Sequence, residues 1–369
     1  MGLFRPALDG LVPYEPGKPE DEVQRELGLD RVVKLASNEG PWGPFPQALE
    51  ALAASAPGLN RYPDGGAYHL RNALAERHEV AAEQIVTAAG ADAVIGHLCV
   101  AALDPGDEVV TGWPSFISYV LDPLKLGAVP RRVPLRDHHL DLEAMLAAIG
   151  PRTKLVFIAT PNNPTGTMTS RAELDAYFEA VPEHVLTVLD QAYFEYIEEP
   201  DYPDGVAEYL LAGRRVLVLR TFSKIYGLAG LRIGYGIGPR EVIEAILKIR
   251  RAFDVSTQAQ VAALASLDGT SELERRRRLT AEGRASLART LGENGLEPAG
   301  PAVANFLFTE AGDGATALFE ALLRQGVIVR PMAAFGSPSG LRITVGTPDE
   351  NACFADALAS VRAASRERV

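Results

Sequence analysis

The sequence predicts an α/β fold with a mostly parallel central sheet and a smaller α+β domain. From about residue 48 onward, helical segments alternate with short β-rich runs, which is typical of parallel strands joined by helices. These runs are apolar at nearly every position, as expected for strands that helices cover on both faces. The expected strands of the large domain are 84–87, 108–111, 154–158, 185–189 and 216–219.

The chain has 369 residues, which is long for one domain, so we expect a large domain and a smaller one. Residues 1–44 are rich in proline and glycine and predict an extended arm, not a packed element, which joins the smaller domain. We expect the large domain over 45–256 and the small domain over 257–369. The expected strands of the small domain are 306–308, 327–330 and 341–345.

Composition excludes several classes of partner. The net charge of −12 argues against nucleic acid and anionic membranes. The run Arg275–Arg278 is flanked by Glu272 and Glu274, which favours a solvated helix face. Cys99 and Cys353 show neither metal-ligand spacing nor a disulfide framework, so we expect no metal site and two buried thiols. No apolar run reaches about 18 residues and no signal peptide is recognisable, which predicts a cytoplasmic protein.

A polar motif follows each of the five expected strands of the large domain. In open α/β sheets, ligands bind outside the carboxyl ends of the strands, so five such motifs predict one shared site. The motifs are Gly90-Ala91-Asp92, Trp113-Pro114-Ser115-Phe116, Pro161-Asn162-Asn163-Pro164-Thr165-Gly166, Asp190-Gln191-Ala192-Tyr193 and Thr221-Phe222-Ser223-Lys224.

The last of these motifs carries the most information. The hydroxyls of Thr221 and Ser223, with Arg232 eight residues after the lysine, suit a dianionic phosphate. Lys224 supplies an amine beside them, and a lysine amine forms a Schiff base with an aldehyde. Pyridoxal phosphate carries both an aldehyde and a phosphate. An isolated Ser-Lys pair is usually an ordinary solvated lysine, but the full spacing favours this cofactor.

Three further residues suit the ring of such a cofactor. Asp190 can keep a pyridine nitrogen protonated, because an opposite charge stabilises the charged form. Tyr193 and Asn163 can donate hydrogen bonds to the phenolate oxygen. Taken alone, an aspartate after a strand is more often a turn or cap residue, and Asn-Pro is a common turn. The spacing of both motifs ahead of the lysine favours the cofactor.

Two weaker motifs complete the expected cofactor site. Ala91 and Asp92 open a helix, whose free N–H groups can bind a phosphate. Phe116 can stack on the pyridine ring. A simple helix cap and a core phenylalanine are the alternatives for these positions.

Together the motifs resemble the histidinol-phosphate aminotransferase group of class I/II, fold-type I pyridoxal-phosphate enzymes, over nearly the whole chain. Gly40 and Ala93 depart from that group, which usually has asparagine at the first position and often an acidic residue at the second. The resemblance is carried by Val12–Lys18, Lys34–Glu39, Arg61-Tyr62-Pro63-Asp64, Pro161–Gly166, Asp190–Tyr193, Thr221–Lys224, Gly227–Gly234, Val329-Arg330-Pro331 and Leu341–Thr347.

The resemblance implies a homodimer with shared active sites, to which the arm contributes contacts. It implies that Tyr62 reaches the cofactor phosphate of the neighbouring subunit. It also implies that Arg342 grips the α-carboxylate of the amino donor, which suits a guanidinium fork. Arg330, together with Tyr14 from the neighbouring subunit, is implied to hold a distal phosphate. The implied substrate-binding residues are Tyr14, Asn38, Asn163, Arg330 and Arg342.

The implied reaction is transamination between L-histidinol phosphate and 2-oxoglutarate, giving imidazole acetol phosphate and glutamate in histidine biosynthesis. Lys224 would also serve as the acid–base group. The segment 113–119 and the arm resemble the aromatic amino acid (phenylalanine) aminotransferases as well, which leaves the amino donor open. A lyase of the threonine-phosphate decarboxylase type uses the same scaffold, and a cofactor-binding regulator would need a DNA-binding motif that the sequence lacks.

Overall fold

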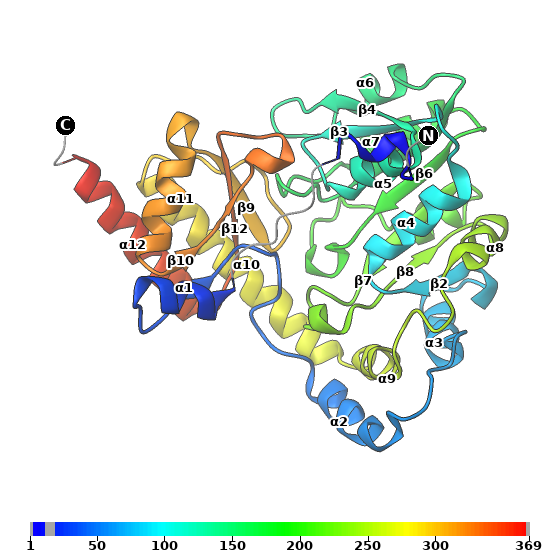
Figure 1. Ribbon diagram of the computed structural model, residues 1–369, viewed down its shortest axis with the longest axis horizontal. Helices are drawn as coiled ribbons and strands as arrows, with labels where there is room; N and C mark the ends of the chain where they lie inside the picture. The colour runs from blue at the N-terminus through cyan, green and yellow to red at the C-terminus, as the bar shows by residue number, and fades with distance from the viewer. Residues whose placement is uncertain (1–2, 12–18, 367–369) are drawn as a thin grey trace.

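The computed structural model describes residues 3–11 and 19–366, and a seven-stranded sheet is its centre (Figure 1). The strands lie in the order β2-β8-β7-β6-β5-β3-β4. Strand β8 alone runs opposite to the other six strands, so the expected mostly parallel sheet is confirmed. The bounds are β2 (Ile85–Ala88), β3 (Glu108–Trp113), β4 (Val129–Pro134), β5 (Thr153–Ala159), β6 (Leu186–Asp190), β7 (Val216–Thr221) and β8 (Gly234–Ile237).

The sequence analysis missed two strands of this sheet, β4 and β8. The edge strand β4 contains two prolines and two arginines, and most of its residues are at least partly exposed, so it has no apolar run. The four residues of β8 include two glycines, which are poor strand formers by themselves. Both strands form because a neighbouring strand supplies hydrogen-bond partners.

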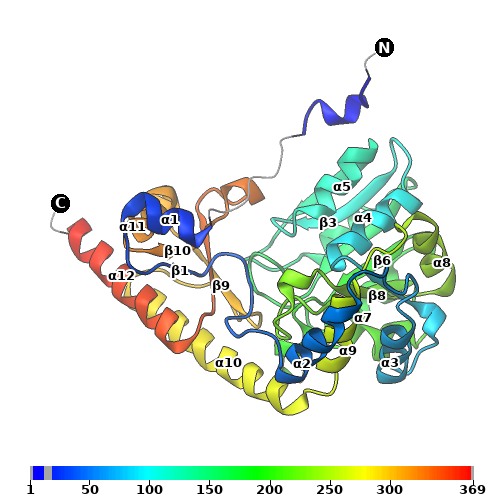
Figure 2. The same ribbon diagram turned by 60° about the horizontal axis from the view of Figure 1, so that its bottom comes forward.

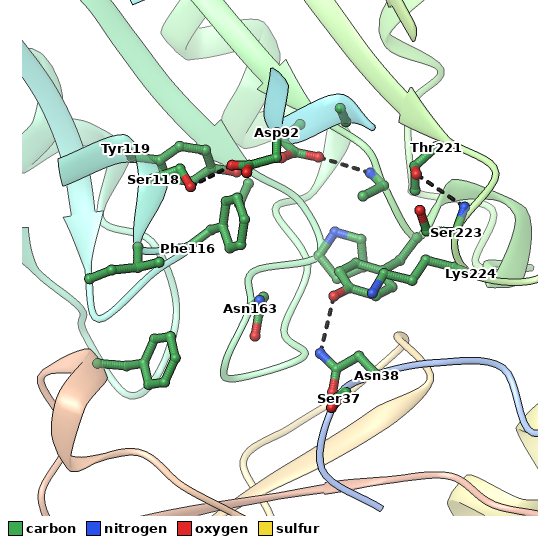
Figure 3. Close-up of a pocket in the computed structure, with 18 of the residues that line it drawn as sticks. Ser37, Asn38, Asp92, Phe116, Ser118, Tyr119, Asn163, Thr221, Ser223 and Lys224 are labelled. Atoms are coloured by element: carbon green, nitrogen blue, oxygen red, sulfur yellow. Dashed lines mark hydrogen bonds between the residues drawn. The ribbon is translucent and has the colours of Figure 1, made fainter. Parts of the chain in front are cut away.

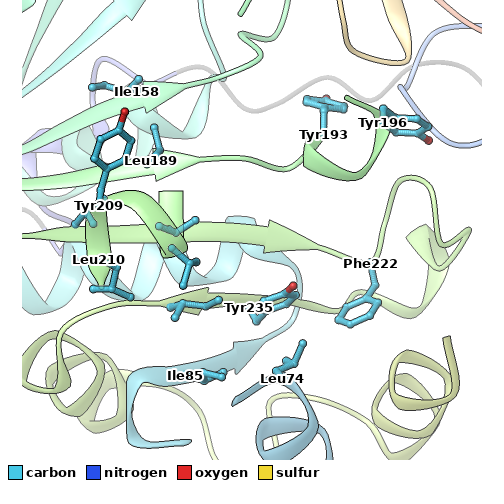
Figure 4. Close-up of a cluster of buried hydrophobic side chains, with 14 of the residues drawn as sticks. Leu74, Ile85, Ile158, Leu189, Tyr193, Tyr196, Tyr209, Leu210, Phe222 and Tyr235 are labelled. Atoms are coloured by element: carbon cyan, nitrogen blue, oxygen red, sulfur yellow. The ribbon is translucent and has the colours of Figure 1, made fainter. Parts of the chain in front are cut away.

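Helices cover both faces of the sheet, because successive side chains of a strand point to opposite faces. In β5, Leu155 and Phe157 belong to one buried cluster, whereas Val156 and Ile158 belong to the other. The first cluster includes residues of α4 (Ala91–Ala102), α5 (Ser118–Leu126) and α8 (Arg240–Ile249). The second, drawn in Figure 4, includes residues of α2 (Pro46–Ser55), α3 (Tyr68–His78), α6 (Leu142–Ala147), α7 (Arg171–Ala180) and α9 (Thr257–Ser266).

A second group of elements lies to one side of the large sheet (Figures 1 and 2). Its antiparallel sheet has the order β11-β12-β9, and a separate parallel pair joins β1 to β10. The strands are β1 (Val33–Lys34), β9 (Phe306–Glu310), β10 (Val327–Ile328), β11 (Arg330–Pro331) and β12 (Gly340–Thr344). The helices are α1 (Glu20–Leu27), α10 (Thr270–Glu293), α11 (Ala315–Arg324) and α12 (Pro348–Arg366).

The arm is less extended than expected, because residues 20–34 fold into α1 and β1. Val23 of α1 is buried in a cluster with Val32, Ala36 and Ile328. The helix has three acidic residues in its first turn and ends at Gly28 in the left-handed conformation, with φ of 65°. Acidic residues favour a helix start and glycine a helix end, so the sequence contained a helix signal that the proline content obscured.

The expected domain limits remain a prediction. Helix α9 begins at residue 257, the expected start of the small domain, but it packs against α2 and α3 beside the large sheet. Within residues 3–11 and 19–366, none of the helices combines the length and apolar character that crossing a bilayer requires.

The arginine run on α10 is only partly a solvated face. The side chains of Arg275 and Arg278 are exposed, whereas that of Arg276 is 3% exposed. Arg276 pairs with Glu272 at 2.7 Å and donates a hydrogen bond to the backbone oxygen of Ile225 at 3.0 Å. Because consecutive helix residues point in different directions, one of the four faces the segment next to Lys224. The prediction of a solvated helix face therefore holds for Arg275 and Arg278 but not for Arg276.

Candidate active site

A cavity of about 560 Å³ lies at the carboxyl ends of β5, β6 and β7, where the large sheet faces β11 and β12 (Figure 3). The structure brings thirteen of the fifteen predicted site residues to its wall. They are Asn38, Ala91, Asp92, Phe116, Asn163, Asp190, Tyr193, Thr221, Ser223, Lys224, Arg232, Arg330 and Arg342.

The other two predicted residues lie elsewhere. Tyr62 is 82% exposed and does not line this cavity. Its ring stacks on Phe253, with 4.7 Å between the ring centroids. Tyr14 lies outside the described residues, so its placement stays a prediction.

The predicted phosphate-binding residues gather around the start of α4. Arg232 lies close to Ser223, with 3.5 Å between Nη1 and Oγ, and the Thr221 hydroxyl accepts a hydrogen bond from the backbone N–H of Ser223 at 3.1 Å. Gly90 precedes the helix with φ of 91°, and a Cβ there would lie 2.6 Å from Nη2 of Arg232. The glycine therefore leaves room for the guanidinium beside the free N–H groups of the helix. This arrangement is a cradle for a dianion.

Lys224 follows β7 and faces the cavity (Figure 3). Solvent reaches part of its side chain, but dense protein surrounds the amine. Burial, followed by the positive charge of Arg342, lowers the pKa of Lys224 from 10.5 to about 8. A larger share of the amine is therefore neutral and nucleophilic near pH 7.

Asp190 is the last residue of β6, and both its oxygens accept hydrogen bonds. The backbone N–H of Ala192 donates to Oδ1 at 3.0 Å, and the hydroxyl of Tyr119 donates to Oδ2 at 2.7 Å. Burial, the largest influence, raises the pKa of Asp190 above its usual value, although these two hydrogen bonds and the charge of Lys224 act in the opposite direction. The sequence analysis did not select Tyr119. The available signal was its position three residues after Phe116, which can place both rings on one side of the chain.

Tyr193 is connected to the small sheet through Asn38. The side-chain amide of Asn38 donates to the Tyr193 hydroxyl at 3.1 Å, and the Thr344 hydroxyl donates to Oδ1 of Asn38 at 3.1 Å. Asn38 is buried and left-handed, with φ of 55°. Burial raises the pKa of Tyr193 to about 12, so its phenol remains protonated at neutral pH. Asn38 thus orients the phenol.

Two arginines enter the cavity from the small sheet. Arg330 of β11 and Arg342 of β12 are directly opposite each other in the antiparallel pair. Arg342 donates to the Asn163 side chain at 2.5 Å and to the backbone oxygen of Ala36 at 2.7 Å. The guanidinium of Arg330 lies over the ring of Phe335, 5.1 Å from its centroid. Directly opposite residues of an antiparallel pair lie about 5 Å apart, so both guanidinium groups are available to an anionic ligand in this cavity.

The donor set of the cavity fits pyridoxal phosphate. Lys224 offers a nucleophilic amine for the aldehyde, and the cradle at α4 suits the phosphate. Asp190 supplies a buried carboxylate and Tyr193 a protonated phenol for the ring. The lining residues that were not predicted as site residues and that carry side chains beyond Cβ are Ser37, Ile117, Ser118, Tyr119, Leu121, Lys125, Pro161 and Phe335.

Comparison with known proteins identifies the family. Residues 30–358 match the family model of aminotransferase class I and II. Histidinol-phosphate aminotransferase from Moorella thermoacetica is 43% identical over 97% of this chain and 93% of its own length. Histidinol-phosphate aminotransferase 2 from Pseudomonas fluorescens strain Pf-5 is 44% identical over 98% of each chain.

Solved structures agree with these relatives. The crystal structure of histidinol-phosphate aminotransferase from Sinorhizobium meliloti in complex with pyridoxal-5'-phosphate has a TM-score of 0.89 and 29% identity, covering 99% of this chain and 98% of its own. Aspartate aminotransferase from Thermus thermophilus with maleate has a TM-score of 0.84 and 26% identity, covering 98% and 99%. These matches confirm the resemblance expected from the motifs and the expected fold class. The chain belongs to the aminotransferase class I and II family.

Proposed function

We propose that this aminotransferase uses pyridoxal phosphate to transfer the amino group of L-histidinol phosphate to 2-oxoglutarate, giving imidazole acetol phosphate and glutamate in histidine biosynthesis. The supporting observation is one cavity that combines the amine of Lys224, the carboxylate of Asp190 and an anion cradle. Relatives 42–44% identical over nearly the whole chain and named histidinol-phosphate aminotransferases support this choice of donor.

Pyridoxal phosphate, when bound, supplies an electron-withdrawing ring. Lys224 is the residue that would hold it covalently, and the same amine would take up the proton that leaves the substrate Cα. A base with a pKa near the working pH is best suited to this task, and the pKa of about 8 meets that condition. Asp190 keeps the ring nitrogen protonated, while Tyr193 and Asn163 donate hydrogen bonds to the phenolate oxygen.

The remaining cofactor contacts follow from the cradle at the start of α4. Thr221, Ser223 and Arg232 bind the phosphate together with the backbone N–H groups of Ala91 and Asp92. In the same cavity, Phe116 packs on a face of the ring.

Each of the two arginines from the small sheet binds a different anionic group of the substrate. Arg342 binds the α-carboxylate of glutamate, and Asn38 and Asn163 complete that side of the pocket. Arg330, with Tyr14 of the neighbouring subunit, binds the distal group, which is a phosphate in histidinol phosphate and a carboxylate in glutamate. A guanidinium fork accepts either anion, so one pocket serves both half-reactions.

The proposal includes a cytoplasmic homodimer with shared active sites, supported by the surface around Tyr62. Tyr62 and Phe253 are 82% and 47% exposed, yet they stack on each other. Exposed aromatic residues are typical of surfaces that a partner covers. These residues support a surface that the second copy covers, and the proposal places Tyr62 at the cofactor phosphate of that copy.

One observation favours a second candidate donor. Phe335 lines the cavity beside Arg330, so an aromatic ring is available to the side chain of a bound donor. Phenylalanine or another aromatic amino acid can pack there. The second candidate is therefore an aromatic amino acid aminotransferase with the same catalytic residues.

Donor profiling of the purified holoenzyme tests the proposal. Histidinol phosphate, phenylalanine and threonine phosphate are compared by kcat/KM with 2-oxoglutarate as acceptor. We expect histidinol phosphate to be preferred. A preference for phenylalanine selects the second candidate, and release of carbon dioxide from threonine phosphate shows a lyase instead.

A further inference from the structure

A hydrogen bond in the wall of the cavity joins Tyr119 to Asp190. Tyr119 belongs to α5 and Asp190 ends β6, so they are 71 residues apart in sequence. The hydroxyl donates to Oδ2 at 2.7 Å, while the backbone N–H of Ala192 holds Oδ1 at 3.0 Å. With one donor on each oxygen, the plane of the carboxylate is held in one orientation toward the cavity.

The ring of Tyr119 is itself fixed in place. It is 1% exposed and stacks on Phe157, with 4.8 Å between centroids and 9° between planes. Phe116, which lines the cavity, meets the same ring edge-on at 5.6 Å (Figure 3). Burial and the neighbouring Asp190 raise the pKa of Tyr119 well above its usual value, so the hydroxyl remains a donor across the neutral range.

The charges around Asp190 determine how much the ionisation of its carboxyl depends on the Tyr119 hydroxyl. Burial and the negative charge of Asp92 on α4 favour the protonated carboxyl, whereas Lys224 after β7 favours the ionised one. Tyr193 and Tyr202 also interact with Asp190, and both are neutral phenols near pH 7. The amine of Lys224 must be neutral when it attacks an aldehyde, so at that stage its charge does not help to keep Asp190 ionised. The Tyr119 hydroxyl is then the side-chain donor that remains on the carboxylate.

We propose that Tyr119 is a positioning residue, whose hydroxyl keeps Asp190 ionised and oriented toward the ring nitrogen of the cofactor. The inference rests on the proposed use of pyridoxal phosphate. It gives Tyr119 no direct contact with the substrate, because the residue acts through Asp190.

The test is cofactor binding to the apoenzyme of Tyr119→Phe, which keeps the ring and its stacking but removes the donor. The dissociation constant of pyridoxal phosphate is measured from about pH 6 to pH 9 and divided by the parent value at each pH, which cancels the titration of the cofactor. Without the donor, the pKa of Asp190 rises, so the carboxyl is protonated over a wider range. We expect binding to be at least tenfold weaker near pH 6, with the ratio falling steadily as the pH rises.

Tyr177→Phe is the matched control. Tyr177 is also 1% exposed, and its hydroxyl bonds to Thr187 at 3.0 Å, but it does not line the cavity. We expect its dissociation constants to stay within about twofold of the parent at every pH. Ring-¹⁵N-labelled cofactor gives a second readout. The ¹⁵N chemical shift of the ring nitrogen should move toward that of neutral pyridine in Tyr119→Phe but not in Tyr177→Phe.

The outcomes separate the two levels of the proposal. A ratio that is constant with pH, or a ¹⁵N signal equal to that of the parent, overturns the role of Tyr119. If the parent itself does not bind pyridoxal phosphate, the proposed function fails instead. If Tyr119→Phe does not fold, 3-fluorotyrosine at position 119 replaces it. Because this side chain is a stronger hydrogen-bond donor, it should lower the pKa of Asp190 and so make cofactor binding near pH 6 tighter than in the parent. A pH profile of the dissociation constant equal to that of the parent refutes the inference.

Discussion

The lowered pKa of Lys224 predicts that the catalytic lysine destabilises the apoenzyme. A charged amine costs free energy in a buried site, so Lys224→Met should raise the free energy of unfolding near pH 7. A lysine whose folded-state pKa is depressed below its unfolded value of 10.5 opposes folding as long as the unfolded-state amine is charged, and this penalty declines with pH over the range where the folded state binds fewer protons. The penalty is therefore full below a pH of about 8 and disappears above 10.5.

The magnitude follows from the size of the shift. A change from 10.5 to about 8 corresponds to about 3 kcal/mol, at about 1.4 kcal/mol for each pKa unit. Because Lys224 is half-buried and faces a solvent-accessible cavity, screening removes part of this penalty. We expect Lys224→Met to stabilise the apoenzyme by roughly 1–3 kcal/mol at pH 7, with a smaller gain as the pH rises toward 10.

The assay is urea unfolding of cofactor-free parent and variant at pH 7 and at pH 10. Lys154→Met is the control, because Lys154 is exposed on β5 and its loss should change stability by less than about 0.5 kcal/mol. A Lys224→Met apoenzyme no more stable than the parent would refute the reasoning. An equal gain at both pH values would assign the effect to the added apolar surface.

Three further predictions concern the holoenzyme. Asp190→Asn should keep the fold and lose several kcal/mol of transition-state stabilisation, of the order that a preorganised charge supplies, as measured by kcat/KM; activity within a few fold of the parent removes Asp190 from this role. Mixing Lys224→Ala with Tyr62→Ala should restore partial activity through heterodimers with one intact site, and none should return if Tyr62 acts within its own subunit. Arg330→Ala should weaken histidinol phosphate about ten- to a hundredfold in kcat/KM and phenylalanine less; unchanged discrimination between the two donors places the phosphate site elsewhere.

The sequence by itself determined the fold class and most of the wall of the cavity. Strands such as 154–158 and 216–219 are apolar on both faces, and this pattern requires helices on both sides. Because parallel strands end at one edge of the sheet, Asp190 and Lys224 could be assigned to one site without a structure. Local signals were insufficient for β4 and β8, whose residues form strands only beside their neighbours.

Only the tertiary structure decided how distant residues complete the site. Tyr119 forms a hydrogen bond with Asp190, which lies 71 residues away in sequence. Asn38 forms one with Tyr193, which lies 155 residues away. The register of β11 and β12 places Arg330 opposite Arg342, and one turn of α10 buries Arg276 against the lysine segment. Hydrophobic periodicity specifies which face of an element is buried, but it does not specify which residue becomes the hydrogen-bond partner of a polar side chain on that face. Those pairings follow from the packing of whole elements, where a buried polar group must find a partner.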